Sequence, residues 1–174
     1  MVNKFNNKDI TRISALVALV AIFSQISLPM PHGIPLTMQV FAIVLISQLL
    51  KPFHAFICIT IYILLGIFGV PVFANFSGGI ERILGPTGGF IFGFYILSYI
   101  LYLSQKANKS CKIFFTLIAV IIFHLIGVVQ YSIVMKTTII NSIIIVSIPY
   151  FLKDIILIYV AILISKKLNK NTTV

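Results

Sequence analysis

The chain has 174 residues, of which 60% are hydrophobic and 9% charged, with 13 Lys and Arg against 3 Asp and Glu. Soluble domains carry about 25% charged residues, so this composition excludes an ordinary water-soluble protein and favours one whose exterior faces lipid. The cations stand at the ends of apolar runs, which disfavours a nucleic-acid-binding face and favours contact with the lipid bilayer and its anionic head groups.

Six apolar runs follow one another, most of them close to the roughly 20 residues that a membrane-spanning helix needs. They predict an all-α integral membrane domain over residues 1–174, with spans over 13–28, 36–50, 53–70, 86–103, 113–135 and 147–164. Only Lys51 and Pro52 separate the second and third runs, which predicts a tight helical hairpin. Pro86 suits the first turn of the fourth helix. The first run lacks a convincing cleavage site, so we interpret it as a retained helix rather than a signal peptide.

The distribution of Lys and Arg predicts how this stack lies in the membrane. One set of span ends holds ten cations, and the other set holds Arg82, Lys136 and Lys153. Basic loops stay in the cytoplasm, so we expect both termini there and residues 29–35, 71–85 and 136–146 outside a prokaryotic plasma membrane. The ten inner cations are Lys4, Lys8, Arg12, Lys51, Lys106, Lys109, Lys112, Lys166, Lys167 and Lys170.

The outer stretch 71–85 is rich in Gly and Phe and contains one acid, Glu81, and one base, Arg82. It is too apolar for a solvated linker. Glycine permits close approach of the backbone, and non-helical backbone at membrane depth is tolerated only where protein or a cavity surrounds it. We therefore expect this loop to fold over a ligand pocket.

Four polar residues stand out as candidate ligand contacts. Asp154 lies one or two turns into the sixth span, where a carboxylate usually faces the interior with a partner; it either pairs with Lys153 or accepts hydrogen bonds from a polar ligand. Lys153 and Arg82 either meet a ligand carboxylate or have structural roles, Lys153 reaching the interface and Arg82 pairing with Glu81. Gln39 faces either a pocket or a neighbouring helix.

Small residues form two stripes at helical spacing. Gly85, Gly89 and Gly93 recur every four residues at the start of the fourth span, which favours close packing against a neighbouring helix. The second stripe lies on the first span and either packs inside the bundle or docks a second membrane protein; it consists of Ser14, Ala18 and Ala21.

The sequence offers no pattern for catalysis. Residues 85–89, GPTGG, do not form a P-loop, because that motif needs GxxxxGK followed by Ser or Thr. His32, His54 and His124 lack metal-ligand spacing, and the two cysteines form no CxxC. No nucleophile stands beside a plausible base. We therefore expect a chain that is not an enzyme, with no catalytic residues, no metal and no cofactor.

Three segments closely resemble the BioY family, the biotin-binding S components of energy-coupling factor (ECF) transporters: residues 34–39 (IPLTMQ), 65–74 (LGIFGVPVFA) and 85–94 (GPTGGFIFGF). The likeness extends over about residues 12–167. It implies a six-helix bundle with a biotin pocket near the outer face. It also implies high-affinity vitamin uptake powered by partners, namely a transmembrane coupling protein and two ATP-binding subunits, with the stripe on the first span as the docking face.

The resemblance also implies site residues. Asn75 matches the loop residue expected near the ligand, and Asp154 matches the family's acid in the last helix, a partner for a ureido N–H of biotin. Many relatives have a lysine three residues after this acid, but here that position holds Leu157. We therefore expect Lys153 or Arg82 to meet the biotin carboxylate. The predicted ligand-binding set also contains Gln39, Gly79, Gly89 and Phe90.

Other functions stay open at this point. An S component of the same fold for a different vitamin or small molecule would share the loops and differ in its pocket residues. A membrane-embedded enzyme would need several catalytic groups at one depth, and the chain offers only Asp154, Lys153 and scattered amides. A structural subunit without a ligand would not need the Gly-rich outer loop.

Overall fold

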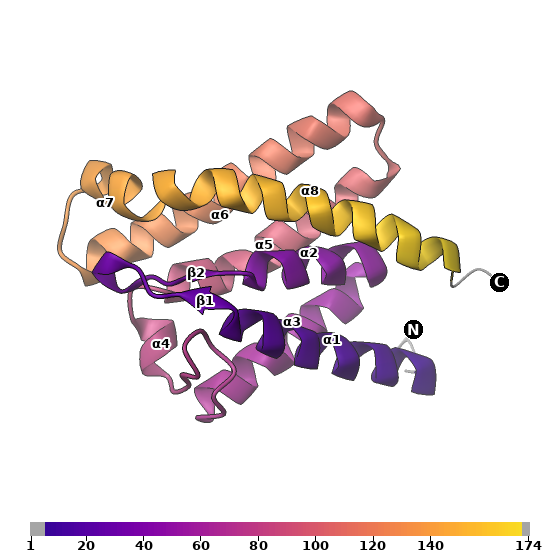
Figure 1. Cartoon of the computed structure of the whole chain (residues 1–174), viewed down its shortest axis with the longest axis horizontal. Coiled ribbons are helices and arrows are strands. Elements are labelled where there is room, and N and C mark those ends of the chain that lie inside the picture. The colour runs from indigo at the N-terminus through magenta and orange to yellow at the C-terminus, as the bar shows by residue number, and fades with distance from the viewer. Residues whose placement is uncertain (1–5, 172–174) are drawn as a thin grey trace.

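Helices overlap all six predicted runs, in chain order (Figure 1). The structure is a computed structural model that describes residues 6–171, apart from the side chains of His32, Lys109, Lys170 and Asn171. Of the predicted inner cations, Lys4 and the side chains of Lys109 and Lys170 therefore lie outside the described residues. The six helices are α1 (Asn7–Gln25), α2 (Gln39–Leu49), α3 (Pro52–Ile67), α5 (Gly88–Leu103), α6 (Lys109–Val134) and α8 (Ile148–Asn171).

Local capping chemistry explains where several helices begin. Asn6 and Asp9 form a capping box at α1, and the Asn108 side chain accepts a hydrogen bond from the Cys111 N–H at the start of α6. Pro52 occupies the first turn of α3, only three residues after the end of α2, which makes the α2–α3 connection a tight hairpin.

The connections at the opposite end of the bundle contain more structure than the sequence predicted. Strand β1 (Ser27–Leu28) pairs antiparallel with β2 (Leu36–Thr37), so α1 ends at Gln25 and α2 begins at Gln39, inside the predicted spans. The predicted loop 136–146 contains α7 (Ile139–Val146). Pro86 precedes α5 rather than standing in its first turn. The remaining short elements are α4 (Glu81–Leu84) and the 3-10 turns η1 (Pro31–Gly33) and η2 (Ser104–Lys106).

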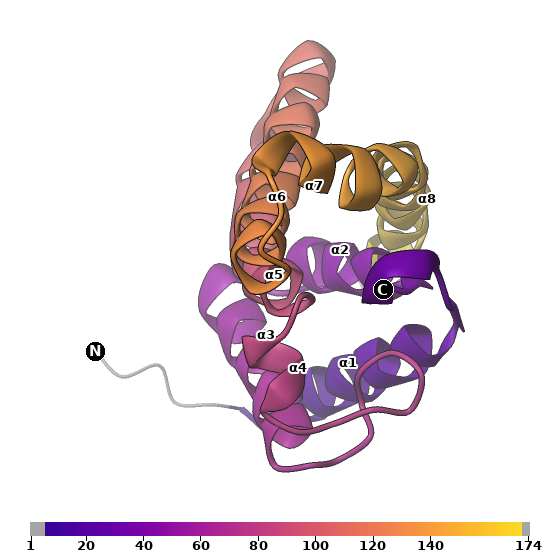
Figure 2. The ribbon, with the colours of Figure 1, turned by 90° about the vertical axis from the view of Figure 1, so that its left-hand side faces the viewer.

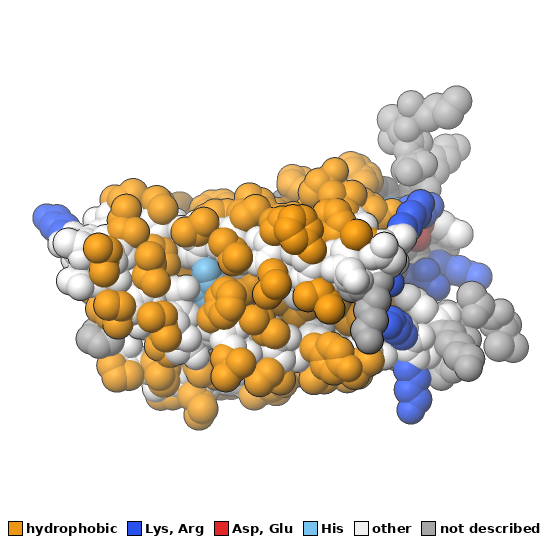
Figure 3. Space-filling view, turned by 90° about the horizontal axis from the view of Figure 1, so that it is seen from above, with side chains coloured by type: hydrophobic (Ala, Val, Ile, Leu, Met, Phe, Trp, Pro, Cys, Tyr) orange, Lys and Arg blue, Asp and Glu red, His pale blue; other side chains and the backbone are white. Residues whose placement is uncertain are grey.

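Three helical stretches of the described chain are long and apolar enough to cross a membrane: Gly88–Lys106, Ser110–Val134 and Ile148–Asn169. The apolar helices α2 and α3 are shorter, with 11 and 16 residues. The exterior agrees with a membrane protein, because apolar side chains cover the middle of the visible face while Lys and Arg gather at the end that carries both termini (Figures 1 and 3).

The core surrounds α2, whose residues from Gln39 to Ser47 are all buried. This helix contacts α1, α3, α5 and α8. Figure 2 looks along the bundle from the end opposite to the termini, where α4, α7 and the β1–β2 ribbon lie. A second, smaller apolar cluster occupies this end and consists of Ile34, Val128, Tyr131, Val146 and Tyr150. The connections at this end are therefore packed structures and not solvated loops.

Glycines allow α5 and α6 to approach closely. A Cβ on Gly89 would lie 2.5 Å from the Ile126 carbonyl oxygen, and a Cβ on Gly93 would lie 2.8 Å from the Phe123 ring. The packing interpretation of the glycine stripe is therefore correct for these two residues. It is wrong for Gly85, which lies in the break between α4 and α5 rather than on the helix face.

Candidate functional site

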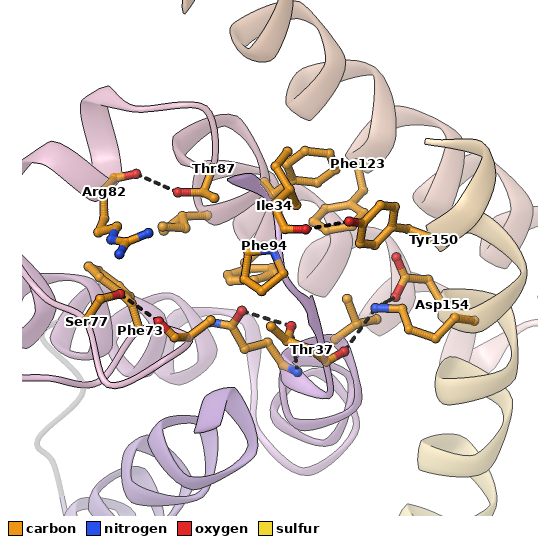
Figure 4. A pocket seen from close by; sticks show the side chains of 17 residues that line it. Ile34, Thr37, Phe73, Ser77, Arg82, Thr87, Phe94, Phe123, Tyr150 and Asp154 are labelled. Carbon is orange, nitrogen blue, oxygen red and sulfur yellow. Dashed lines mark hydrogen bonds and ion pairs between the residues drawn. The ribbon is translucent and has the colours of Figure 1, made fainter. Parts of the chain in front are cut away.

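Side chains from several elements line a pocket (Figure 4). These elements meet at the end of the bundle opposite to the termini (Figure 1). The pocket lies between the β1–β2 ribbon, α2, the stretch 73–82, α5, α6 and α8. Ten of its lining residues are apolar or aromatic, and three are charged. The lining residues are Ile34, Pro35, Thr37, Gln39, Val40, Phe73, Ala74, Ser77, Arg82, Thr87, Phe90, Ile91, Phe94, Phe123, Tyr150, Lys153 and Asp154.

Asp154 provides the anionic side of the pocket. Its side chain, on α8, is 2% exposed. The Lys153 Nζ lies 2.6 Å from Asp154 Oδ1, and the His124 Nε2 lies 3.2 Å from Oδ2. Burying a carboxylate is costly unless it is paired, and these two neighbours supply the pairing.

The carboxylate keeps hydrogen-bonding capacity despite these neighbours. The Lys153 contact has an ion-pair distance without the alignment of a hydrogen bond, because Asp154 Oδ1 has no hydrogen-bond donor among the described residues. The Lys153 Nζ instead donates to the Thr37 carbonyl oxygen at 3.0 Å. Each carboxylate oxygen has two acceptor sites, so Oδ1 can accept a hydrogen bond from a group that arrives from the pocket beside the Lys153 ammonium.

Arg82 lies across the pocket from Asp154 (Figure 4). It belongs to α4, and the Thr87 hydroxyl donates to its carbonyl oxygen at 2.9 Å, which fixes the backbone at this turn. The ion pair with Glu81 that the sequence allowed does not form: within residues 6–171, the described ion pairs involve only His124, Lys153 and Asp154. The guanidinium is half-buried and lines the pocket.

Aromatic rings fill the space between the two charged ends. Phe94 and Phe123 stack with ring centroids 5.7 Å apart, and Phe90 meets Phe123 edge to face at 5.5 Å. From the opposite wall, Phe73 packs edge to face on Tyr62 at 5.5 Å and lies directly over Gly66, where a Cβ would overlap its ring. The resulting middle section is apolar and suits a ligand with a hydrocarbon body.

Hydrogen bonds fasten the outer stretch to the bundle. The Gln25 side chain donates to the Phe73 carbonyl oxygen at 3.2 Å and accepts from the Phe76 N–H at 2.8 Å. The Ser27 hydroxyl donates to Asn75 Oδ1 at 2.8 Å. Asn75 and Phe76 both have a left-handed backbone, with φ of 59° and 50°, so this turn is strained and depends on these bonds.

A chain of hydrogen bonds starts at two polar residues of the pocket wall, Thr37 and Gln39. The Thr37 hydroxyl donates to Gln39 Oε1 at 3.1 Å, and Gln39 Nε2 donates to the Tyr62 hydroxyl at 2.5 Å. Tyr62 in turn donates to the Val72 carbonyl oxygen at 3.1 Å. Gln39 therefore faces the pocket and also joins α2 to α3 and to the outer stretch.

The structure brings five of the eight predicted ligand-binding residues to the pocket wall: Gln39, Arg82, Phe90, Lys153 and Asp154. The other three lie outside the lining. Asn75 is exposed on the outer turn, Gly79 forms a turn with φ of 98°, and Gly89 faces α6. A ligand-binding role for these three residues stays a prediction. Leu157 is half-buried and does not line the pocket.

Sequence reasoning missed most of the pocket lining, including two residues with hydroxyl groups, and a histidine beside it. Thr37 and Tyr150 line the pocket, and His124 stands behind Asp154. His124 was considered only as a metal ligand. An ionisable residue inside an apolar run is a signal for a functional position, and it was available for His124.

The predicted docking residues lie on the outer side of α1. Ser14 and Ala18 are exposed and Ala21 is half-buried. The opposite face of the helix is buried and consists of Ile13, Val17, Val20 and Ser24. Packing inside this bundle is therefore disfavoured for Ser14 and Ala18, whereas Ala21 packs against the core; docking of a partner stays a prediction.

Comparisons with known proteins place the chain in a family. The sequence model of the BioY family matches residues 1–173. The probable biotin transporter BioY of Pyrococcus horikoshii is 35% identical over 165 residues, which cover 95% of this chain and 98% of that protein. The biotin transporter BioY of Thermotoga maritima is 34% identical over 103 residues, 59% of this chain and 60% of the relative.

A solved structure has the same fold. The crystal structure of the S-component for biotin from an ECF-type ABC transporter superposes with a TM-score of 0.83 at 22% identity, covering 98% of this chain and 95% of the other. Together with the match over residues 1–173, which confirms the resemblance found in the sequence, this fold identifies the chain as a member of the BioY family.

Proposed function

We propose that this chain is a high-affinity biotin-binding S component of an ECF vitamin uptake transporter. One observation carries the proposal. The pocket combines a buried acceptor, Asp154 Oδ1, with a cation at the opposite end, Arg82, across an apolar and aromatic middle. The relatives and the solved structure named above are described as biotin transporters or as an S component for biotin, which supports the same ligand.

The chemistry of biotin fits this arrangement. Its ureido ring carries N–H donors, its bicycle and valeryl chain are apolar, and its carboxylate requires a cation. We assign a ureido N–H to Asp154, the apolar body to the Phe residues of the wall, and the carboxylate to Arg82. Lys153 is the less suitable cation because it already contacts Asp154 and donates to Thr37.

We further propose six membrane spans with both termini on the cytoplasmic side of the plasma membrane. The two termini lie at the end where Lys and Arg gather (Figures 1 and 3). The pocket is lined by elements of the other end, as an uptake protein with an external ligand requires. The three long apolar helices and the shorter α2 and α3 support several spans, with α1 as the sixth.

The exposed Cys111 offers a native reporter of this topology. A membrane-impermeant maleimide should label it in inside-out vesicles and not in intact cells. A cysteine introduced at the exposed Asn141 of α7, in a Cys111→Ser background, should show the opposite pattern. Labelling of both positions from the same side would contradict the topology.

Energy for uptake is expected from partner subunits. The sequence contains no P-loop, so we propose a transmembrane coupling protein and two ATP-binding subunits as partners. The stripe of Ser14, Ala18 and Ala21 on α1, of which the first two are exposed, is the proposed docking face, because small residues allow close approach of a second helix.

The test of the ligand is equilibrium binding of biotin to the purified, detergent-solubilised chain. We expect tight binding by the wild type and strongly weakened binding by Asp154→Asn, which removes the negative charge and keeps the size of the side chain. Asp9→Asn is the matched control, because Asp9 lies in the capping box of α1. Equal binding by Asp154→Asn and the wild type would refute the assigned contact. Tight binding of a different vitamin in place of biotin would keep the fold and change the ligand.

A further inference from the structure

A buried histidine stands behind the carboxylate of the pocket and has no role in the binding scheme described above. His124 is 3% exposed, in the middle of α6, and its Nε2 lies 3.2 Å from Asp154 Oδ2. Neither ring nitrogen has an aligned hydrogen-bond partner among the described residues, so the Nε2–Oδ2 contact is a close approach without hydrogen-bond alignment. A polar ring at this depth is costly, so packing alone does not explain it.

The distance to Asp154 indicates which ring nitrogen faces the carboxylate as a donor. A ring nitrogen that close to a carboxylate oxygen is attractive only when it bears hydrogen, because two lone pairs would repel each other. The short distance therefore favours a proton on Nε2 over a bare nitrogen at that position.

Aromatic rings enclose this contact. The His124 ring lies 5.4 Å from Phe123, 5.9 Å from Phe90 and 5.5 Å from Phe151, measured between ring centroids. Such walls exclude water and lower the local dielectric constant, which strengthens the attraction between the imidazole N–H and the carboxylate. They also hold the ring in one orientation.

The two neighbours of Asp154 approach it from different sides. Lys153 lines the pocket together with Asp154, whereas His124 does not line it. Lys153 contacts Oδ1 and His124 contacts Oδ2. The lysine side chain is long and 19% exposed, so it is the more mobile of the two, and the enclosed imidazole is the rigid one.

We propose that His124 is a positioning residue for ligand binding: it holds Asp154 from behind, so that Oδ1 stays directed at the ligand. The proposal rests on the proposed function, because the ligand group that Asp154 receives is taken to be an N–H of biotin. His124 itself does not touch the ligand. Rigid support of this kind lets a binding group meet its ligand without first being reorganised.

Three substitutions separate positioning from packing. His124→Phe keeps an aromatic ring among the enclosing Phe side chains and removes the N–H donor. It should weaken biotin binding about 10- to 100-fold, which is the effect of losing a contact to a charged group. His124→Gln can place an amide N–H where Nε2 stands and should bind within about threefold of the wild type. His124→Asn has the same chemistry on a shorter side chain and should resemble His124→Phe.

A double-mutant cycle identifies the residue through which His124 acts. In an Asp154→Asn background, His124→Phe should change the biotin affinity by less than about twofold, because the charge that it supports is gone. Ligand-free His124→Phe should keep a cooperative thermal transition, at a lower melting temperature than the wild type, because the buried Asp154 carboxylate has lost one of its two partners. If His124→Phe does not fold, the comparison of His124→Gln with His124→Asn carries the same test.

Two results would overturn the inference while leaving the proposed function intact. One is a biotin affinity of His124→Phe equal to that of the wild type. If His124→Phe does not fold, the corresponding result is a wild-type biotin affinity of His124→Asn. The other is a loss of the same size with and without the Asp154 carboxylate. Absence of biotin binding by the folded wild type would instead overturn the proposed function, and this inference with it.

Discussion

Replacing Arg82 with glutamine decides which cation meets a ligand carboxylate. The sequence left Arg82 and Lys153 open. In the structure the Lys153 Nζ contacts Asp154 at 2.6 Å and donates to the Thr37 carbonyl oxygen at 3.0 Å. Arg82 lines the far end of the pocket, and its guanidinium forms no ion pair within the described residues. We therefore expect Arg82→Gln to remove the carboxylate contact.

The size of the effect follows from the surroundings of Arg82. A hydrogen bond to a charged group contributes about 1.5–3 kcal/mol, which corresponds to about a 10- to 100-fold change in affinity. The guanidinium is half-buried, so solvent screening reduces this value. We expect Arg82→Gln to weaken biotin binding about tenfold, at the lower end of the range.

The assay compares biotin with biotinamide, its uncharged analogue, by titration calorimetry. Arg82→Gln should weaken biotin binding and leave the affinity for biotinamide within about threefold of the wild-type value. Lys153→Gln is the matched control, since it removes the other cation; it should weaken both ligands to a similar degree, because it disturbs Asp154. The reasoning would be refuted if Arg82→Gln weakened both ligands equally, or if only Lys153→Gln discriminated between them.

Three further predictions concern the outer stretch 71–85, the docking of a partner subunit on α1, and the packing of α5 against α6. Gln25→Ala should speed biotin dissociation roughly tenfold in stopped-flow measurements, because it frees the outer turn, whereas Gln48→Ala at the other end of the bundle should not. Ala18→Leu should abolish biotin uptake by cells and spare binding, with Ala15→Leu as the control on a neighbouring face of α1; loss of binding as well would argue against docking. Gly89→Ala should destabilise the protein by about 1–3 kcal/mol in thermal or denaturant unfolding, since its Cβ would lie 2.5 Å from a carbonyl oxygen of α6, and unchanged stability would contradict that packing.

The helices were predictable because hydropathy and length carry a strong signal. The positions at which these helices end near the pocket were not predictable. Strands of two residues, such as Ser27–Leu28 and Leu36–Thr37, are too short for a periodic pattern. Helix α7 was taken for part of a loop, although Thr138, which caps it, is a recognisable start signal. The number of membrane spans stays a prediction.

The site was predictable where one residue carries the signal on its own. Asp154 is an acid inside an apolar run, and the sequence identified it for that reason. His124 belongs to another helix, 30 residues earlier, and no local pattern connects it to Asp154. Asn75 illustrates the opposite case: the resemblance predicts a ligand contact, and in the structure its side chain accepts a hydrogen bond from Ser27 on the outer turn.

The most direct test of the account is saturation binding of radiolabelled biotin to the purified wild-type chain without any partner subunit. The account predicts one saturable site per chain, competed by unlabelled biotin and not by a panel of chemically different vitamins. A well-folded preparation that shows no saturable biotin binding, or one from which another vitamin displaces biotin more effectively than biotin itself, would contradict it.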